Sequence, residues 1–236
     1  MLLAKLREEV LEANLELVRK GLVLYTFGNA SGVDREQGLM VIKPSGVDYD
    51  HLTPQKMVVT DLNGVTVEGD LRPSSDLDTH SLLYREFPTI GAVVHTHSEF
   101  ATSFSQAGLP IPPFGTTHAD YFHGPVPVTA LLTDEAIGGR YVHETGVAIV
   151  KRFRPGGPER DIDPLAVPAC LVHGHAPFVW GKTPHDAAHN AVVLEAVARM
   201  AFRTISLQAN AVEVSQALLD RHYYRKHGAQ ATYGQS

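Results

Sequence analysis

Two short apolar runs of this chain end in the same way. The run IGAVV (90–94) leads into HTH (95–97), and the run ACLV (169–172) leads into HGH (173–175). Uninterrupted apolar stretches of this length are typical of strands that are covered on both faces of a sheet. The pattern therefore predicts two buried strands, each followed directly by two histidines at the edge of the core.

The spacing of these histidines indicates a metal site. Side chains alternate across a strand, so His95 and His97 share one face and can bind the same ion. His173 and His175 also share a face by this argument, which leaves open which of them is the third ligand. A three-histidine site keeps a coordination position for substrate, as a catalytic zinc requires. The alternative, unrelated surface or core imidazoles, is disfavoured because the motif occurs twice.

Helical and extended patterns alternate along the whole chain, which predicts one α/β domain over residues 1–236. Expected helices cover residues 2–20, 77–87, 98–108, 183–206 and 212–226. Expected strands cover residues 39–42, 90–94, 146–150 and 169–172, with two more in 57–69 that meet at Asn63-Gly64. The Pro- and Gly-rich stretch 110–127 is expected to be a loop of the kind that carries function.

Composition restricts the class of protein. A length of 236 residues with 44% hydrophobic residues is sufficient for a large core. The net charge of −6 argues against a nucleic-acid partner, which would require a broad basic face. Residues 1–20 contain no long apolar run, so no signal or membrane anchor is expected and a cytoplasmic location is predicted. The single cysteine, Cys170, lies in an apolar stretch and is expected to be buried and inert.

Two serine-containing turns are candidate anion sites. KPSG (43–46) and PSSD (73–76) each offer hydroxyl and backbone N–H groups, and Ser75 precedes an expected helix whose amino end favours phosphate. The alternative is that they are ordinary turn and cap residues. Asp120 lies in the long loop, where a carboxylate also acts as a simple turn former.

Motifs along the whole chain resemble those of the L-ribulose-5-phosphate 4-epimerases, within the class II sugar-phosphate aldolase superfamily. They are FGNAS (27–31), KPSGVDYDHLT (43–53), PSSD (73–76), HTHSEFAT (95–102), GTTHADYF (115–122), LVHGHAPFVWGK (171–182) and LLDRHYYRKHGAQATYGQ (218–235). The resemblance implies a single-domain, three-layer α/β/α fold around a central mixed sheet. It also implies a homotetramer with active sites between adjacent subunits.

The resemblance further implies one zinc ion per subunit. Its ligands would be His95, His97 and His173, with the carboxylate of Asp76 also at the metal. Such ligands accept other divalent ions, including manganese and cobalt.

The reaction implied by the resemblance inverts C4 of L-ribulose 5-phosphate. The C3–C4 bond breaks, glycolaldehyde phosphate rotates, and re-addition through its other face gives D-xylulose 5-phosphate. Two acid/base groups are required on opposite sides of C4. The family assigns them to residues that match Asp120 and Tyr233, with Tyr233 from a neighbouring chain and His222 nearby. The residues matching the phosphate anchor are Asn29, Lys43, Ser45, Gly46, Ser74 and Ser75.

Two alternatives share this scaffold. A sugar-phosphate aldolase of the L-fuculose-1-phosphate type would use the same metal but release the aldehyde. Such aldolases usually have an acid/base glutamate at the place of Asp76, so the shorter aspartate favours the epimerase. A non-catalytic head domain of cytoskeletal proteins is disfavoured because it should have lost the metal ligands.

Overall fold

The computed structural model describes residues 1–154, 156, 161–227 and 231–232. The strands among these residues form one seven-stranded sheet in the order β4-β3-β2-β1-β5-β7-β6. Their bounds are β1 Asn29–Asp34, β2 Leu39–Ile42, β3 Val58–Asp61, β4 Thr66–Glu68, β5 Ala92–His95, β6 Ala169–Leu171 and β7 Pro177–Gly181.

Eight α-helices accompany the sheet in the described part of the chain. They are α1 Ala4–Arg19, α2 Leu77–Glu86, α3 Glu99–Ala107, α4 Thr116–Ala119, α5 Asp134–Gly138, α6 Tyr141–Phe153, α7 Pro184–Leu207 and α8 Gln216–His227. Two 3-10 turns, Tyr49–His51 and Pro54–Lys56, precede β3. None of the helices in these residues is long and apolar enough to cross a membrane.

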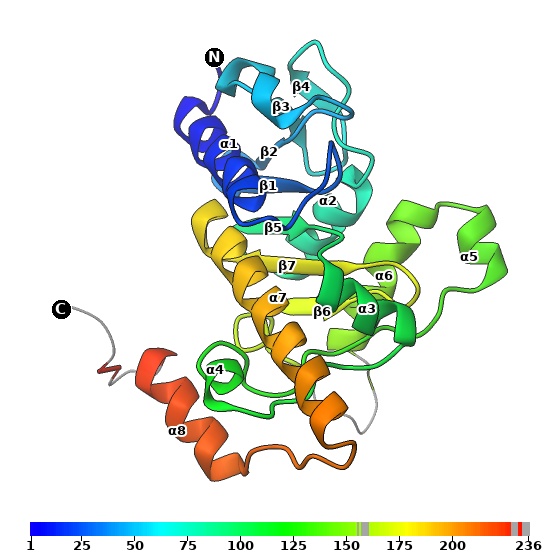
Figure 1. Cartoon of the computed structure of the whole chain (residues 1–236). Coiled ribbons are helices and arrows are strands. Elements are labelled where there is room, and N and C mark those ends of the chain that lie inside the picture. The colour runs from blue at the N-terminus through cyan, green and yellow to red at the C-terminus, as the bar shows by residue number, and fades with distance from the viewer. Residues whose placement is uncertain (155, 157–160, 228–230, 233–236) are drawn as a thin grey trace.

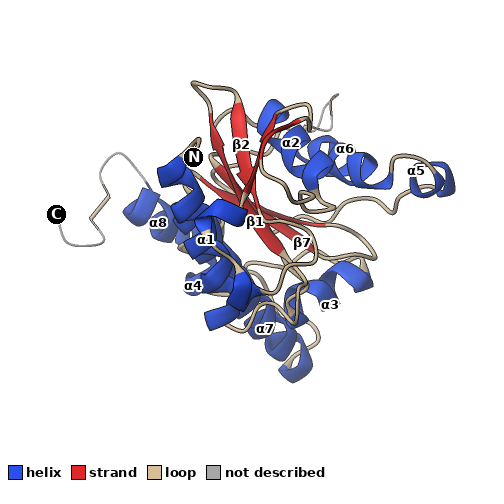
Figure 2. Cartoon of the chain, turned by 90° about the horizontal axis from the view of Figure 1, so that it is seen from above, coloured by secondary structure: helices blue, strands red, loops and turns tan. Residues whose placement is uncertain are grey.

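The elements are arranged in three layers. Helices α1 and α7 cover one face of the sheet, and α2 and α6 cover the other (Figure 2). Helix α8 lies beside α4 at the end of the molecule away from α1 (Figure 1). The three-layer α/β/α prediction is therefore confirmed.

The expectation of a mixed sheet is wrong, because the central sheet is antiparallel. Every pair of neighbouring strands runs in opposite directions, and the parallel bridge between Val128 and Leu171 lies outside the named strands. Strand direction depends on the path that each connection takes around the sheet. No local residue pattern records that path.

One expected strand is a helix. The run GVAIV (146–150) lies inside α6, where the buried residues Thr145, Ile149 and Phe153 recur at the spacing of one helix face. A short continuous apolar run has the same appearance in a buried strand and in a buried helix. The longer amphipathic pattern around this run, over residues 141–153, is the feature that indicates a helix.

Two central strands were not predicted. The strand β1 reads NASGVD and shows no apolar run, whereas the strand β7 reads PFVWG, an apolar run that opens with a proline, which is rare in central strands. β1 is buried nonetheless, and its Asn29 and Ser31 point toward α2, where they bond other polar groups. Asn29 and Ser31 thus face the layer that contains the candidate site.

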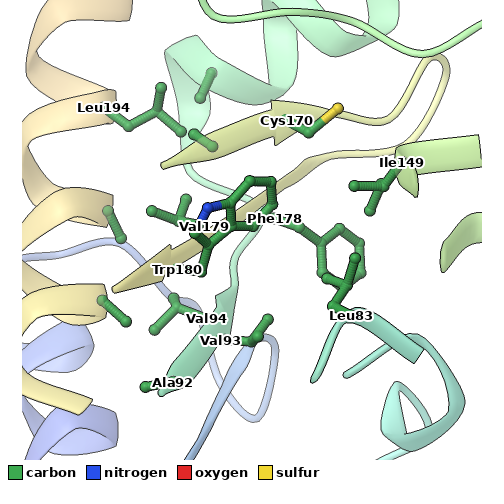
Figure 3. Packing of buried hydrophobic residues seen from close by; sticks show 14 of the residues in the cluster. Leu83, Ala92, Val93, Val94, Ile149, Cys170, Phe178, Val179, Trp180 and Leu194 are labelled. Carbon is green, nitrogen blue, oxygen red and sulfur yellow. The ribbon is translucent and has the colours of Figure 1, made fainter. Parts of the chain in front are cut away.

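The core fills both faces of the sheet. Leu194 of α7 lies on the same face of the sheet as Val179, whereas Leu83 of α2 lies beside Phe178 on the opposite face (Figure 3). Cys170 of β6 is 0% exposed, as expected. Burial raises the pKa of its thiol, so this cysteine stays protonated and unreactive.

The start of β5 depends on a glycine that no other residue can replace without strain. A Cβ atom added to Gly91 would lie 2.0 Å from the carbonyl oxygen of Lys182, and the Gly91 N–H is bonded to the Gly181 carbonyl at 2.8 Å. We expect Gly91→Ala to lower the free energy of unfolding by about 3 kcal/mol or more, measured by chemical denaturation. The control Gly138→Ala, with open space around the new atom, should change it by less than about 1 kcal/mol. Equal stability of the two variants would contradict this packing argument.

Candidate metal centre and active site

Three histidines converge at the end of β5. One ring nitrogen of each of His95, His97 and His175 lies within 4.8 Å of the others. The Nε2 atoms of His95 and His97 are 3.1 Å apart, and the ring of His175 lies 4.9 Å from that of His95 and 5.1 Å from that of His97, between centroids. The structure therefore brings together the two histidines of the first motif, as predicted, with one histidine of the second.

Strand pairing explains this convergence. β5 and β7 pair so that His95 lies opposite Phe178, and their rings stack with centroids 4.2 Å apart. The tight turn before β7 is closed by bonds from the His175 N–H to Val172 and from the Val172 N–H to Ala176. The turn thus carries His175 back over the end of the neighbouring strand.

The geometry and chemistry of this donor set fit a divalent metal ion. Two nitrogens bound to tetrahedral zinc at about 2.0 to 2.1 Å lie about 3.3 to 3.4 Å apart, close to the spacing of the His95 and His97 nitrogens. Nδ1 of His95 lies 3.0 Å from the Pro177 carbonyl, to which it donates when Nε2 binds the ion. The pKa of His175 is lowered to about 4, mainly by burial and further by the neighbouring His95 and His97. Its imidazole is therefore neutral and able to bind metal at pH 7.

The choice of His173 as third ligand is wrong. A Cβ atom added to Gly108 at the end of α3 would lie 2.6 Å from Nε2 of His173, so this ring packs against α3. Strand β6 ends at Leu171, and Gly174 in the turn has a φ of 73°. Strand alternation therefore does not extend to the HGH motif, and the two rings point in different directions.

Asp76 lines the same cavity, immediately before α2. Its Oδ2 accepts a hydrogen bond of 2.6 Å from the Asn29 side chain. Burial opposes ionisation, but His95, His80 and the Asn29 amide together hold the pKa of Asp76 below its usual range. The carboxylate is therefore charged and held in place beside the histidine cluster.

The two serine-containing turns meet in this cavity, whose volume is about 620 Å³. The Ser45 N–H bonds the Arg72 carbonyl and the Ser74 N–H bonds the Lys43 carbonyl, both at 2.9 Å. Lys43 is buried, and burial lowers the pKa of its ammonium group. All six residues expected at a phosphate anchor line the cavity: Asn29, Lys43, Ser45, Gly46, Ser74 and Ser75.

Further lining residues were not identified from the sequence. Tyr141 begins α6, and its hydroxyl lies 3.4 Å from Nδ1 of His175. Thr26 and Phe27 line the cavity from the loop before β1. The local sequence pattern did not reveal Tyr141. That pattern predicted a strand at residues 146–150 in place of α6, so no helix was expected to begin at residue 141.

Asp120 and His222, two of the three residues that the sequence suggested for acid/base chemistry, lie away from the histidine cavity in this chain. Asp120 accepts from Nδ1 of His222 at 3.0 Å and from Arg225 at 3.1 Å, and Lys226 is 3.8 Å away. Burial opposes ionisation, but Arg225, His222 and Lys226 hold the pKa of Asp120 below its usual range. Asp120 does not line the histidine cavity among the described residues. Tyr233 lies outside the described residues.

Fold and site together define a class: an α/β protein in which a three-histidine cluster that fits a divalent metal and two serine-containing turns line one cavity. The chain belongs to the class II aldolase and adducin N-terminal domain family, whose model matches residues 8–202. Aldolases of this family use a divalent metal, usually zinc, and act on sugar phosphates.

Solved structures share the fold of this chain. An L-fuculose 1-phosphate aldolase matches with a TM-score of 0.78 and 24% identity, over 94% of this chain and 96% of that protein. YgbL from Klebsiella pneumoniae, a proposed aldolase/epimerase/decarboxylase, matches with a TM-score of 0.73 and 25% identity, over 92% and 97%. The L-fuculose-1-phosphate aldolase from Thermus thermophilus matches with a TM-score of 0.65 and 23% identity, over 89% and 100%.

Proposed function

We propose that this chain is a metal-dependent enzyme that breaks and re-forms a carbon–carbon bond of a ketose phosphate. Specifically, it would interconvert L-ribulose 5-phosphate and D-xylulose 5-phosphate. The observation that carries the proposal is the single cavity that joins the histidine cluster to the two serine-containing turns. One end of the cavity suits the reacting oxygens of a sugar, and the other end suits its phosphate.

Residues at one end of the cavity would bind the phosphate, and residues at the other end would bind the metal ion. Lys43 and the hydroxyls of Ser45 and Ser75 would hold the phosphate, which must stay fixed while the aldehyde group turns. His95, His97, His175 and Asp76 would hold the metal ion. When bound, a divalent cation supplies Lewis-acid stabilisation of the negative charge that develops on two adjacent substrate oxygens.

Inversion at C4 also needs proton transfer on two sides of the substrate. We assign these roles to Asp120 and Tyr233, with His222 as the residue that orients the Asp120 carboxylate through its 3.0 Å hydrogen bond. Since Asp120 is not part of the cavity of its own chain, the assignment requires a neighbouring subunit to bring it there. A homotetramer with shared active sites is therefore part of the proposal.

An aldolase of the L-fuculose-1-phosphate type is the second candidate. It is favoured by solved aldolases that match more than nine-tenths of this chain. The epimerase is favoured by the geometry of Asp76, a short carboxylate that Asn29 already binds at 2.6 Å. A carboxylate held in this way suits the metal better than it suits a proton transfer at the substrate.

A product assay tests the proposal. Purified protein is expected to convert L-ribulose 5-phosphate into D-xylulose 5-phosphate, detected by NMR of the sugar. Activity should disappear after dialysis against a strong chelator and return when zinc, manganese or cobalt is added. A mock dialysis against metal-saturated chelator is the control. Release of glycolaldehyde phosphate without D-xylulose 5-phosphate, or cleavage of L-fuculose 1-phosphate alone, would favour the aldolase.

A further inference from the structure

Behind the metal centre lies a buried histidine that the proposed reaction does not use. His80 of α2 is 0% exposed, and its Nδ1 lies 2.8 Å from the hydroxyl of Ser31 on β1. The same hydroxyl lies 2.7 Å from the phenol oxygen of Tyr84. The other ring nitrogen of His80, Nε2, has no hydrogen-bond partner among the described residues.

The direction of these hydrogen bonds places the proton of His80. Burial lowers the pKa of His80 to about 3 and raises the pKa of the Tyr84 phenol, so the imidazole is neutral and the phenol is protonated at pH 7. In the arrangement that we infer, Tyr84 donates to Ser31 and Ser31 donates to Nδ1 of His80. The imidazole hydrogen is left on Nε2, and a buried N–H without a partner costs free energy.

The position of His80 shows what this N–H can serve. His80 follows Asp76 by one helical turn, and its backbone N–H bonds the Asp76 carbonyl at 3.1 Å. Its ring packs edge-on against Phe178 with centroids 5.9 Å apart, and Phe178 stacks on His95. His80 therefore lies directly behind the metal centre on its protein side.

We propose that His80 is a positioning residue of the metal centre: Ser31 and Tyr84 fix its ring, and its Nε2–H, which has no direct partner in the part of the chain that the structure describes, stabilises the nearby charge of the Asp76 carboxylate. His80 has no contact with substrate in this role. Partners behind the ligands of a metal fix ligand orientation and so determine how tightly the ion is held. The inference rests on the proposed metal-dependent function of the same cavity.

Two substitutions separate the two nitrogens of His80. Asparagine can reach Ser31 as Nδ1 does but has nothing at the place of Nε2, whereas the amide of glutamine extends to the place of Nε2. We expect His80→Asn to weaken zinc binding by about 10- to 100-fold, and His80→Gln to recover most of the affinity. The dissociation constant of zinc is measured without sugar, by competition with a chromophoric chelator.

A matched control shows that the effect is not general destabilisation. Asn14 is buried on the opposite side of β1 and binds the Ala30 backbone through both side-chain atoms. Asn14→Ala should lower the unfolding free energy but leave the dissociation constant of zinc unchanged. Long-range proton–nitrogen NMR of the metal-free protein should show the hydrogen of His80 on Nε2.

Each outcome decides the inference. Wild-type zinc affinity in His80→Asn, or a hydrogen on Nδ1 of His80, would overturn the positioning role and leave the proposed reaction intact. If His80→Asn does not fold, Ser31→Ala replaces it in the zinc titration, with weaker binding expected. Weaker zinc binding in a protein without activity on any ketose phosphate would support the positioning role and reject the proposed reaction. A wild-type chain that binds no divalent metal would reject both.

Discussion

Replacement of His175 by alanine is expected to remove the bound metal and with it the activity. His175 supplies the third imidazole of a cluster whose donor atoms lie within 4.8 Å of one another. Because loss of a supporting partner already weakens metal binding by about 10- to 100-fold, loss of a ligand should weaken it by more than about 100-fold. Metal content by elemental analysis and a zinc competition titration measure this change.

The matched control is His173→Ala. His173 belongs to the same turn but packs against α3 next to Gly108. We expect this variant to keep its metal content, although it leaves a gap beside α3 and should be less stable to heat. If His173→Ala lost the metal and His175→Ala kept it, the described geometry of the turn would be wrong.

The second large effect is expected for Asp120→Asn. The amide keeps the size of the carboxylate but cannot take up a proton at neutral pH, so turnover should fall by about 10²- to 10⁴-fold. Metal content should not change, because Asp120 is not part of the histidine cavity among the described residues. The rate of epimerisation and the zinc content of the same sample provide the measurement.

Asp220→Asn is the control for this substitution. Asp220 also lies on the α4–α8 side of the molecule and binds a histidine, His123, at 2.7 Å. We expect near-normal turnover in this variant. Equal losses in both variants would mean that Asp120 acts only by holding α8. Normal turnover in Asp120→Asn would remove its proposed acid/base role.

The pairing of Asp120 also stabilises the fold in a pH-dependent way. Its pKa in the folded chain is lowered. Its contribution is therefore complete above the unfolded pKa and is lost as the pH falls through the lowered folded value.

Local sequence patterns were sufficient to predict some features of this protein but not others. The spacing of His95 and His97 predicted a shared ion, and the structure brings them together. The same argument failed for His173 and His175 because it assumes an extended chain, and β6 has already ended at Leu171. Side chains alternate between the two faces with a period of two residues only inside a strand.

Features that depend on distant parts of the chain could not be predicted locally. The two serine-containing turns are joined by a bridge between Pro44 and Pro73, which no property of either turn reveals. Only the family resemblance placed them at one phosphate. The antiparallel direction of the sheet and the central strand β1 were missed for the same reason, since pairing partners and not residue types determine them.

The junction of α3 with the HGH turn has a consequence for sequence divergence. Gly108 ends α3 with a φ of 65°, and a Cβ atom added there would lie 2.6 Å from the His173 ring, while the Gly174 N–H bonds Ser105 of the same helix. A side chain at position 108 would push the turn that carries His175. We therefore expect Gly108, which has no functional group, to be replaced as rarely among active relatives as a residue that binds the metal ion.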